Sequence, residues 1–197
     1  ELEVHFRKTS EIKNSSDEMG LFLRSVLREN GIEPTRVSGI SLCSVVPSLL
    51  HSIRNVCYKF FDLEPFVLQA GAKTGLKIKY RNPLEVGADR IATAVAAAHL
   101  YADRNIIAVD FGTATTFDVV TKDGIYNGGI IAPGVNLSLK SLVNSADQIS
   151  FFSIKKQNRI VGKNTVEALR SGFYWGYVGL INNIILKIEN KQDAIQA

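Results

Sequence analysis

The sequence predicts an α/β fold, because segments with the period of strands and segments with the period of helices follow each other along its 197 residues. The first half has the order strand, helix, strand, loop, helix. In the second half, three strands with glycine-containing turns precede a helix. Hydrophobic residues make up 46% and charged residues 21% of the chain, which excludes a disordered or collagen-like protein. Because the pattern changes near Asn105, we predict two domains, residues 1–104 and 105–197.

The first half begins with an alternation of apolar and polar residues over 2–6, which predicts a half-buried strand. Ser15 and Glu18 have the spacing of a capping box and predict the start of an amphipathic helix that ends at Gly31. The other segments predicted here are a buried strand over 37–46, a helix over 47–60, a short strand over 66–68, a loop with strand character over 75–83 and a helix over 87–102.

The second half predicts a long helix over 165–190, in which Gly172, Gly176 and Gly179 lie on one face. Such a stripe of small residues lets another helix approach closely, and that helix can belong to another subunit or to this chain. The elements predicted before it are strands over 106–110, 115–121 and 125–132 and a helix over about 135–144.

Composition and charge point away from several classes of protein. The net charge of +4 comes from scattered basic residues, so no nucleic-acid interface is indicated. Cys43 and Cys57 lack the spacing of zinc ligands or of a redox pair, which favours buried free thiols in a reducing cytosol. No apolar stretch reaches the ~18 residues of a membrane span, and the first residues do not form a signal or transit peptide. We therefore expect a cytoplasmic protein without a membrane partner.

A glycine and several hydroxyl residues follow the apolar strand that ends at Asp110. Gly112 permits close approach of the backbone to a phosphate group. Thr113, Thr115 and Thr116 can donate hydrogen bonds to that phosphate, and Asp110 can hold a cation that faces it. The same segment also fits a tight hairpin whose threonines are only strand formers, and both interpretations stay open at this point.

A second polar cluster, residues 87–90, stands at the predicted start of a helix, where free N–H groups favour an anionic ligand. Arg90 can give a carboxylate two hydrogen bonds. Asp89 can accept the proton of a substrate hydroxyl, because an acid kept ionised by an arginine acts through its position. The alternative is that Asp89 only caps the helix and Arg90 only pairs with Glu85.

Two glycine-containing pairs, Gly128-Gly129 and Pro133-Gly134, flank a predicted strand and open the next helix. A second contact to a phosphate or a sugar requires such an arrangement, although glycine pairs also serve plain packing. Asp123-Gly124 is a hairpin turn in either interpretation.

These motifs together resemble the type III pantothenate kinases. Their order and spacing match that family across nearly the whole chain, and Ser44-Val45-Val46-Pro47 and Lys73-Thr74-Gly75 also fit. The four segments that carry the resemblance are Gly87-Ala88-Asp89-Arg90, Asp110-Phe111-Gly112-Thr113-Ala114-Thr115-Thr116, Gly128-Gly129-Ile130-Ile131-Ala132-Pro133-Gly134 and Gly162-Lys163-Asn164-Thr165.

The resemblance implies an α/β protein of the actin-like ATPase superfamily, with duplicated ribonuclease-H-like domains whose mixed β-sheets are flanked by helices. Residues 1–104 are then the first domain without its N-terminal phosphate-loop strand, and residues 105–197 are the second domain without its C-terminal part. The resemblance also implies a homodimer that transfers the γ-phosphate of ATP to the terminal hydroxyl of pantothenate. The product is 4'-phosphopantothenate, in the first step of coenzyme A biosynthesis.

By position, the resemblance assigns Asp89 as the proton acceptor and Asp110 as the ligand of a monovalent cation, potassium or ammonium. Gly112 and Thr113 are assigned to ATP, which Mg²⁺ accompanies because charge on the transferred phosphoryl group must be neutralised. We therefore expect Asp89 and Asp110 to face one shared pocket. The pantothenate site is implied for Tyr80, Gly87, Ala88, Asp89, Arg90 and, reaching across the dimer, Thr165.

Two departures from the family stand at the ends of the chain. The family opens with an Asp-x-Gly-Asn-Thr loop that cradles the nucleotide phosphates, and it has a late Thr-Gly-Gly stretch. Neither motif occurs within these 197 residues. We therefore expect a chain shortened at both ends, with negligible kinase activity if the phosphate loop is physically missing.

Two alternative functions are a regulatory or accessory protein that has the same fold, and a sugar or acetate kinase of the same superfamily. The first is disfavoured because Asp89, Asp110 and Thr113 are chemically competent residues. The second is disfavoured because the helix start at 87–90 suits a substrate that bears a carboxylate rather than a neutral sugar.

Overall fold

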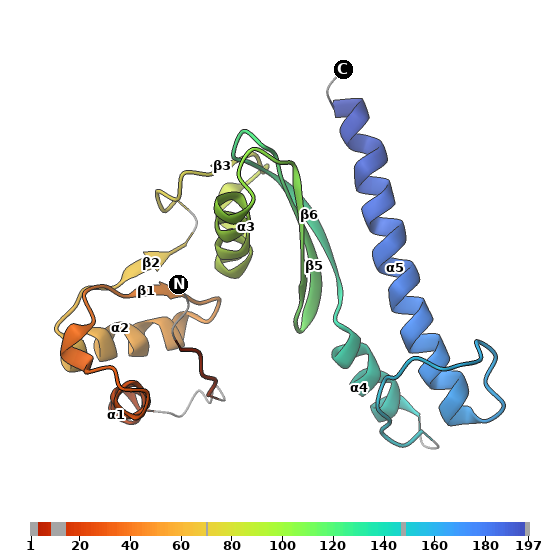
Figure 1. Cartoon of the computed structure of the whole chain (residues 1–197), viewed down its shortest axis with the longest axis horizontal. Coiled ribbons are helices and arrows are strands. Elements are labelled where there is room, and N and C mark those ends of the chain that lie inside the picture. The colour runs from red at the N-terminus through yellow and green to blue at the C-terminus, as the bar shows by residue number, and fades with distance from the viewer. Residues whose placement is uncertain (1–3, 9–14, 70, 147–148, 196–197) are drawn as a thin grey trace. The chain divides into compact units, whose positions relative to one another are not determined.

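The computed structural model describes residues 4–8, 15–69, 71–146 and 149–195 and has a mixed α/β fold (Figure 1). The chain divides into two compact units. Unit one comprises Glu1–Arg104 and Thr121–Asn127, and unit two comprises Asn105–Val120 and Gly128–Ala197. The assignment of 1–104 and 105–197 to ribonuclease-H-like domains stays a prediction.

Unit one begins with helix α1 (Ser16–Glu29), whose start confirms the predicted capping box. The Ser15 hydroxyl accepts a hydrogen bond from the Glu18 N–H, and the Glu18 carboxylate accepts one from the Ser15 N–H. Hydrogen bonds to the Glu18 carboxylate from the Ser15 N–H, the larger cause, and from the Ser15 hydroxyl lower the pKa of Glu18. After the helix, Gly31 has a φ of 75°, a left-handed conformation that favours glycine and ends the helix as predicted.

Helix α2 (Pro47–Phe61) packs against α1. Gly20 makes this contact possible, because any side chain there would overlap the ring of Phe60. Lys59 Nζ also lies 2.6 Å from Asp17 Oδ1, although both side chains are exposed and such pairs contribute little to stability.

A short parallel pair forms the first sheet of unit one: β1 (Ser41–Cys43) runs beside β2 (Phe66–Leu68). Helix α3 (Ala88–Leu100) packs against both strands. The core of the unit is formed by apolar side chains from these elements and from α2: Leu42, Val56, Leu68, Ile91 and Ala94. The remaining elements are two 3₁₀ turns, η1 (Pro34–Arg36) and η2 (Pro83–Glu85), and strand β3 (Lys77–Ile78). Strand β3 pairs in parallel with the first residues of β6 (Ile125–Pro133).

Two predicted strands of unit one were wrong. The strand over 37–46 is reduced to the three residues of β1, which pair with the three residues of β2. It ends after Cys43 because the Ser44 side chain accepts from the Val46 N–H and donates to the Val46 carbonyl, and these local bonds replace sheet bonds. Part of the strand over 2–6 lies outside the described residues. Residues 4–8 are not in a strand; instead, the Phe6 ring packs edge-to-face on Phe22 of α1 at 5.8 Å.

Unit two contains an antiparallel hairpin of β4 (Ile106–Phe111) and β5 (Ala114–Val120), and β5 lies beside β6 (Ile125–Pro133). Helix α4 (Val135–Ser145) follows directly. The core includes Phe117 and Val120 of β5 and Leu139 of α4. These elements agree with the predicted strands and helix to within one or two residues.

Helix α5 (Thr165–Ile195), the long blue helix of Figure 1, also agrees with its prediction. The predicted stripe of Gly172, Gly176 and Gly179 is exposed, and a side chain at any of them would meet nothing within 4 Å. Within the described part of the chain, therefore, no helix packs on this stripe.

Among the residues that the structure describes, no helix combines the length and the apolar character that crossing a membrane requires.

Candidate active site

The predicted phosphate-binding segment is the turn between β4 and β5. The turn consists of Gly112 and Thr113, and the strands around it pair Asp110 with Thr116 in the antiparallel register. The Gly112 N–H donates to the Ala114 carbonyl at 2.9 Å. Asp110, Gly112 and Thr113 are all exposed. The turn therefore presents a carboxylate, a hydroxyl and unhindered backbone on one accessible edge of unit two.

The three threonines of this segment do not act alike. Thr115 of β5 is completely buried, whereas Thr113 in the turn is exposed. Because side chains alternate between the faces of a strand, Thr116 lies on the opposite face from Thr115. The Thr116 hydroxyl donates to the buried Asp118 carboxylate at 3.4 Å. The prediction that all three hydroxyls can face a phosphate is thus wrong for Thr115, and Thr116 is engaged within the protein.

Gly134, at the end of β6, fixes the position of this turn. Its N–H donates to the Thr113 carbonyl at 3.0 Å. A side chain at Gly134 would overlap the carbonyl oxygens of both Gly112 and Thr113. Gly134 is also the N-cap of α4, without a side-chain cap, so the first amides of α4 start beside the turn. Gly112 differs, since a side chain there would meet the Ala114 oxygen only at 3.5 Å.

The second predicted cluster stands at the start of α3 in unit one. Gly87 is the N-cap and provides no side-chain cap. Asp89 is exposed, and its Oδ1 accepts the Arg90 N–H at 2.8 Å. A side chain on Gly87 would begin 2.6 Å from that same Oδ1, so the glycine makes room for the carboxylate. Asp89 thus contacts the first turn of its own helix while remaining open to solvent.

Arg90 differs from Asp89 in its burial. Only 8% of Arg90 is exposed, and its guanidinium lies over the Tyr126 ring at 5.9 Å. Glu85, the partner considered in the alternative interpretation, accepts a hydrogen bond from the Asn82 amide at 3.0 Å.

Tyr80 lies just after β3 and is 37% exposed. Unit one thus holds Tyr80 and residues 87–90, and a backbone bond from Lys79 N–H to the Tyr126 carbonyl fixes the strand before Tyr80.

Cys43 is a neighbour of Asp89 that the sequence analysis missed. Burial raises the pKa of the Cys43 thiol, and the negative charge of Asp89 raises it further. The prediction of two buried thiols was wrong for Cys43, which is exposed, while Cys57 is buried. Val45, two residues after Cys43, lies 3.9 Å from where a side chain on Gly87 would begin. The loop after β1 therefore borders the start of α3, a proximity without a local signal in the sequence.

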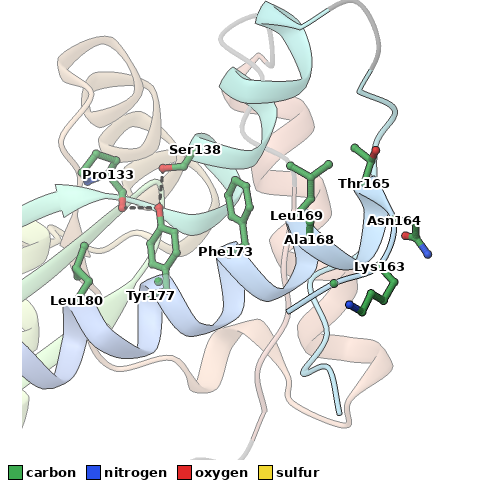
Figure 2. Close-up of a pocket in the computed structure, with 13 residues that line it drawn as sticks. Pro133, Ser138, Lys163, Asn164, Thr165, Ala168, Leu169, Phe173, Tyr177 and Leu180 are labelled. Carbon is green, nitrogen blue, oxygen red and sulfur yellow. Dashed lines mark hydrogen bonds between the residues drawn. The ribbon is translucent and has the colours of Figure 1, made fainter. Parts of the chain in front are cut away.

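Thr165 begins α5 in unit two, and its neighbours hold the helix start in place. The Asn164 side chain accepts from the Glu167 N–H at 2.9 Å, and the Glu167 carboxylate accepts from the Lys163 N–H at 2.8 Å. A side chain at Gly162 would overlap the backbone of Glu167 and Ala168. Thr165 is exposed and lies at one end of a groove of about 900 Å³ (Figure 2).

The groove is mostly apolar, and its walls come from α5, from the segment before it and from the junction of β6 and α4. Figure 2 shows Phe173 and Tyr177 of α5 directed towards that junction. Its lining includes Pro133, Ser138, Thr165, Phe173 and Tyr177.

The predicted residues thus fall into two sets. Tyr80 and residues 87–90 belong to unit one, and Asp110, Gly112, Thr113 and Thr165 belong to unit two. The expectation that Asp89 and Asp110 face one pocket stays a prediction. Among the described residues, no three histidine, cysteine or acidic side chains gather into a metal-binding cluster.

An accessible turn of glycine, threonine and an acid beside a helix start offers backbone and hydroxyl donors that suit a phosphate-bearing ligand. The comparisons with known proteins agree. The family model described as type III pantothenate kinase matches residues 1–187. The chain belongs to the type III pantothenate kinase family, and it is a kinase that phosphorylates pantothenate in coenzyme A biosynthesis.

Curated relatives carry the same description. The chain is 47% identical to a type III pantothenate kinase of Legionella pneumophila (strain Corby) over 191 residues, which are 97% of this chain and 74% of the relative. It is 42% identical to a type III pantothenate kinase of Elusimicrobium minutum (strain Pei191) over 190 residues, which are 96% of this chain and 74% of the relative.

One solved structure, from Campylobacter jejuni, has a TM-score of 0.52 and 21% sequence identity and is described as a conserved protein assigned to the Baf family of transcriptional activators. The match covers 76% of this chain and 65% of that chain. At this identity the likeness concerns the fold alone.

Replacement of Gly134 by alanine is expected to lower the free energy of unfolding by about 1–3 kcal/mol, because the new methyl group overlaps two backbone carbonyls that cannot rotate away. Gly112→Ala is the matched control, since its methyl group meets the Ala114 oxygen at an ordinary distance. Urea unfolding of both variants measures the difference. Equal stability of the two variants would contradict the contact between Gly134 and the turn.

Cys43 is expected to react more rapidly with iodoacetamide in an Asp89→Asn variant than in the unaltered protein at pH 8. Its thiol pKa is raised partly by Asp89, so loss of that charge lowers the pKa and increases the thiolate fraction at a fixed pH. Burial, the larger cause, persists. Cys57 is the internal control, because Asp89 is not a cause of its raised pKa. Mass spectrometry of the two cysteine peptides gives both rates. An unchanged Cys43 rate would contradict the effect of the Asp89 charge on the Cys43 thiol.

Proposed function

We propose that Asp89 is the proton acceptor in the transfer of the ATP γ-phosphate to the terminal hydroxyl of pantothenate, which yields 4'-phosphopantothenate. The observation that carries the proposal is the exposed carboxylate of Asp89 at a helix start that has no side-chain cap. Its hydrogen bond from the Arg90 N–H orients one oxygen and leaves the other for a substrate hydroxyl. A carboxylate held in this way takes up the hydroxyl proton as the alcohol oxygen attacks phosphorus.

We propose that the same helix start binds the polar groups of pantothenate. Gly87 and Ala88 supply backbone amides, which at a helix start are free to bind an anion or a carbonyl oxygen. Tyr80 offers an exposed ring and hydroxyl on the same unit. Arg90, whose guanidinium is buried over Tyr126, adds positive charge behind the site. Thr165 of a second copy, reaching across the proposed dimer, adds a hydroxyl from the start of α5.

Asp110, Gly112 and Thr113 form the proposed nucleotide site. A side chain at Gly112 would not clash with the rest of the protein, so packing alone does not demand a glycine there. The open space in front of Gly112 suits the close approach of a phosphate group. The exposed Thr113 hydroxyl and the first amides of α4 are donors for its oxygens. The Asp110 carboxylate, exposed at the end of β4, suits a potassium or ammonium ion. Mg²⁺ bound with ATP supplies charge neutralisation on the transferred phosphoryl group.

The proposal includes a cytoplasmic homodimer with two ribonuclease-H-like domains, 1–104 and 105–197. The open glycine stripe of α5 supports a subunit contact, because a glycine face that packs on nothing within the described chain leaves room for a second helix. Thr165 lies at the start of the same helix, so a partner that packs on α5 would lie near a proposed pantothenate contact.

Asp89→Asn is expected to lower kcat by a factor of about 10²–10⁴ in the full-length protein, because an amide cannot accept the hydroxyl proton. Pantothenate-dependent release of ADP measures the rate. Asp123→Asn is the matched control, since it removes an exposed acid from the turn between β5 and β6 and should leave the rate unchanged.

Circular dichroism establishes that both variants retain the fold. Undiminished turnover in Asp89→Asn would refute the assigned proton acceptor. Absence of turnover in the unaltered full-length protein would favour the regulatory alternative instead.

Potassium or ammonium is expected to support much higher activity than sodium at equal ionic strength, and Asp110→Asn is expected to abolish this difference. The reason is that potassium and ammonium give up hydration water at a lower cost than sodium does, and a site with one protein carboxylate and phosphate oxygens repays little of that cost. Rates in potassium, ammonium and sodium chloride, for both proteins, measure the selectivity. Equal rates in all three salts would count against a cation site at Asp110.

A further inference from the structure

Tyr177 joins three elements of unit two. Its phenol oxygen lies 2.6 Å from Ser138 Oγ on α4 and 3.3 Å from the Pro133 carbonyl at the end of β6. Figure 2 shows both hydrogen bonds converging on the one hydroxyl. A single side chain of α5 therefore holds the junction of β6 and α4 at two points, one on each side of Gly134.

The held junction is the part of the chain that contacts the nucleotide turn. Gly134 follows Pro133 directly, donates its N–H to the Thr113 carbonyl and packs against the carbonyls of Gly112 and Thr113. The Ser138 N–H donates to the Gly134 carbonyl at 2.9 Å, which makes the first helical bond of α4. A shift of the Pro133 carbonyl or of Ser138 would thus move Gly134, and with it the turn.

The ring of Tyr177 is itself supported. It stacks on Phe173, one helical turn earlier, with centroids 6.3 Å apart and an interplanar angle of 14°. Phe173 in turn packs edge-to-face with Phe152 at 5.6 Å. The stack and the half-buried ring do not need the hydroxyl and would persist in phenylalanine. The two hydrogen bonds to the junction depend on the hydroxyl.

We propose that Tyr177 is a positioning residue for nucleotide binding: its hydroxyl, acting through Pro133 and Ser138, keeps the Gly112–Thr113 turn in place. The inference rests on the proposed role of that turn in binding ATP. The hydrogen bonds of Tyr177 go to Pro133 and Ser138 and not to the turn itself. Its effect on Gly112 and Thr113 therefore passes through Gly134. Because Tyr177 and Thr165 belong to one helix, the same hydroxyl links the start of α5 to the nucleotide turn.

The test compares Tyr177→Phe, Ser138→Ala and the double variant in the full-length protein. Each single change is expected to raise the KM for ATP about threefold to tenfold, the range that loss of one or two hydrogen bonds produces, while the KM for pantothenate and the melting temperature change little. The double variant should be no worse than Tyr177→Phe, because both changes remove the same contact. Tyr174→Phe is the matched control, since no hydrogen bond of its hydroxyl is recorded among the described residues, and it should leave both KM values unchanged.

Thr113→Ala separates this inference from the proposed function. If Thr113→Ala raises the KM for ATP and Tyr177→Phe does not, the inference is overturned and the nucleotide site stands. If Thr113→Ala also has no effect, the proposed nucleotide site fails. Equal increases in the KM for ATP and for pantothenate would show a general loss of structure and would equally overturn a positioning role. Should Tyr177→Phe fold poorly, Ser138→Ala carries the same test.

Discussion

The close backbone contact between Gly134 and the Gly112–Thr113 turn is the constraint on which the candidate nucleotide site depends. It joins the end of one strand, the beginning of a helix and the tip of a hairpin, and it leaves no room for a side chain at Gly134. Because carbonyl oxygens cannot turn aside as a flexible side chain can, the three elements are fixed relative to one another within the unit. The exposed donors at the turn are thereby held before any ligand arrives, which reduces the entropy that binding must overcome.

The elements with strong local signals could be predicted from the sequence. The capping box of Ser15 and Glu18 marked the start of α1, and the hairpin and helix of unit two followed from their apolar period and their glycine turns. The predictions failed where a local bond competed with the sheet, as Ser44 does with β1, and where a motif ignored the alternation of a strand, as with Thr115. The spacing of apolar residues shows neither a hydrogen bond from a side chain to the backbone nor which face of a strand is covered, so it could not reveal either effect.

The residues proposed for the candidate site could be chosen from the sequence, but the side chains that contact or position them could not. Asp89, Asp110 and Thr113 were identified because they belong to motifs shared with a kinase family, and family membership is now established by close relatives. Tyr177 and Cys43 were missed, since each acts on a residue distant in the sequence: Tyr177 is 44 positions from Pro133. Such contacts become visible only when helices and strands have been placed.

The thiol next to the proposed proton acceptor has a chemical consequence. A thiolate, not a thiol, attacks peroxides and disulfides, so a raised pKa at the exposed Cys43 leaves less of the reactive form at a given pH. A mixed disulfide or a sulfinic acid there would put bulk or a second negative charge beside the entrance to the start of α3. The carboxylate of Asp89 thus lowers the thiolate fraction of the cysteine beside it.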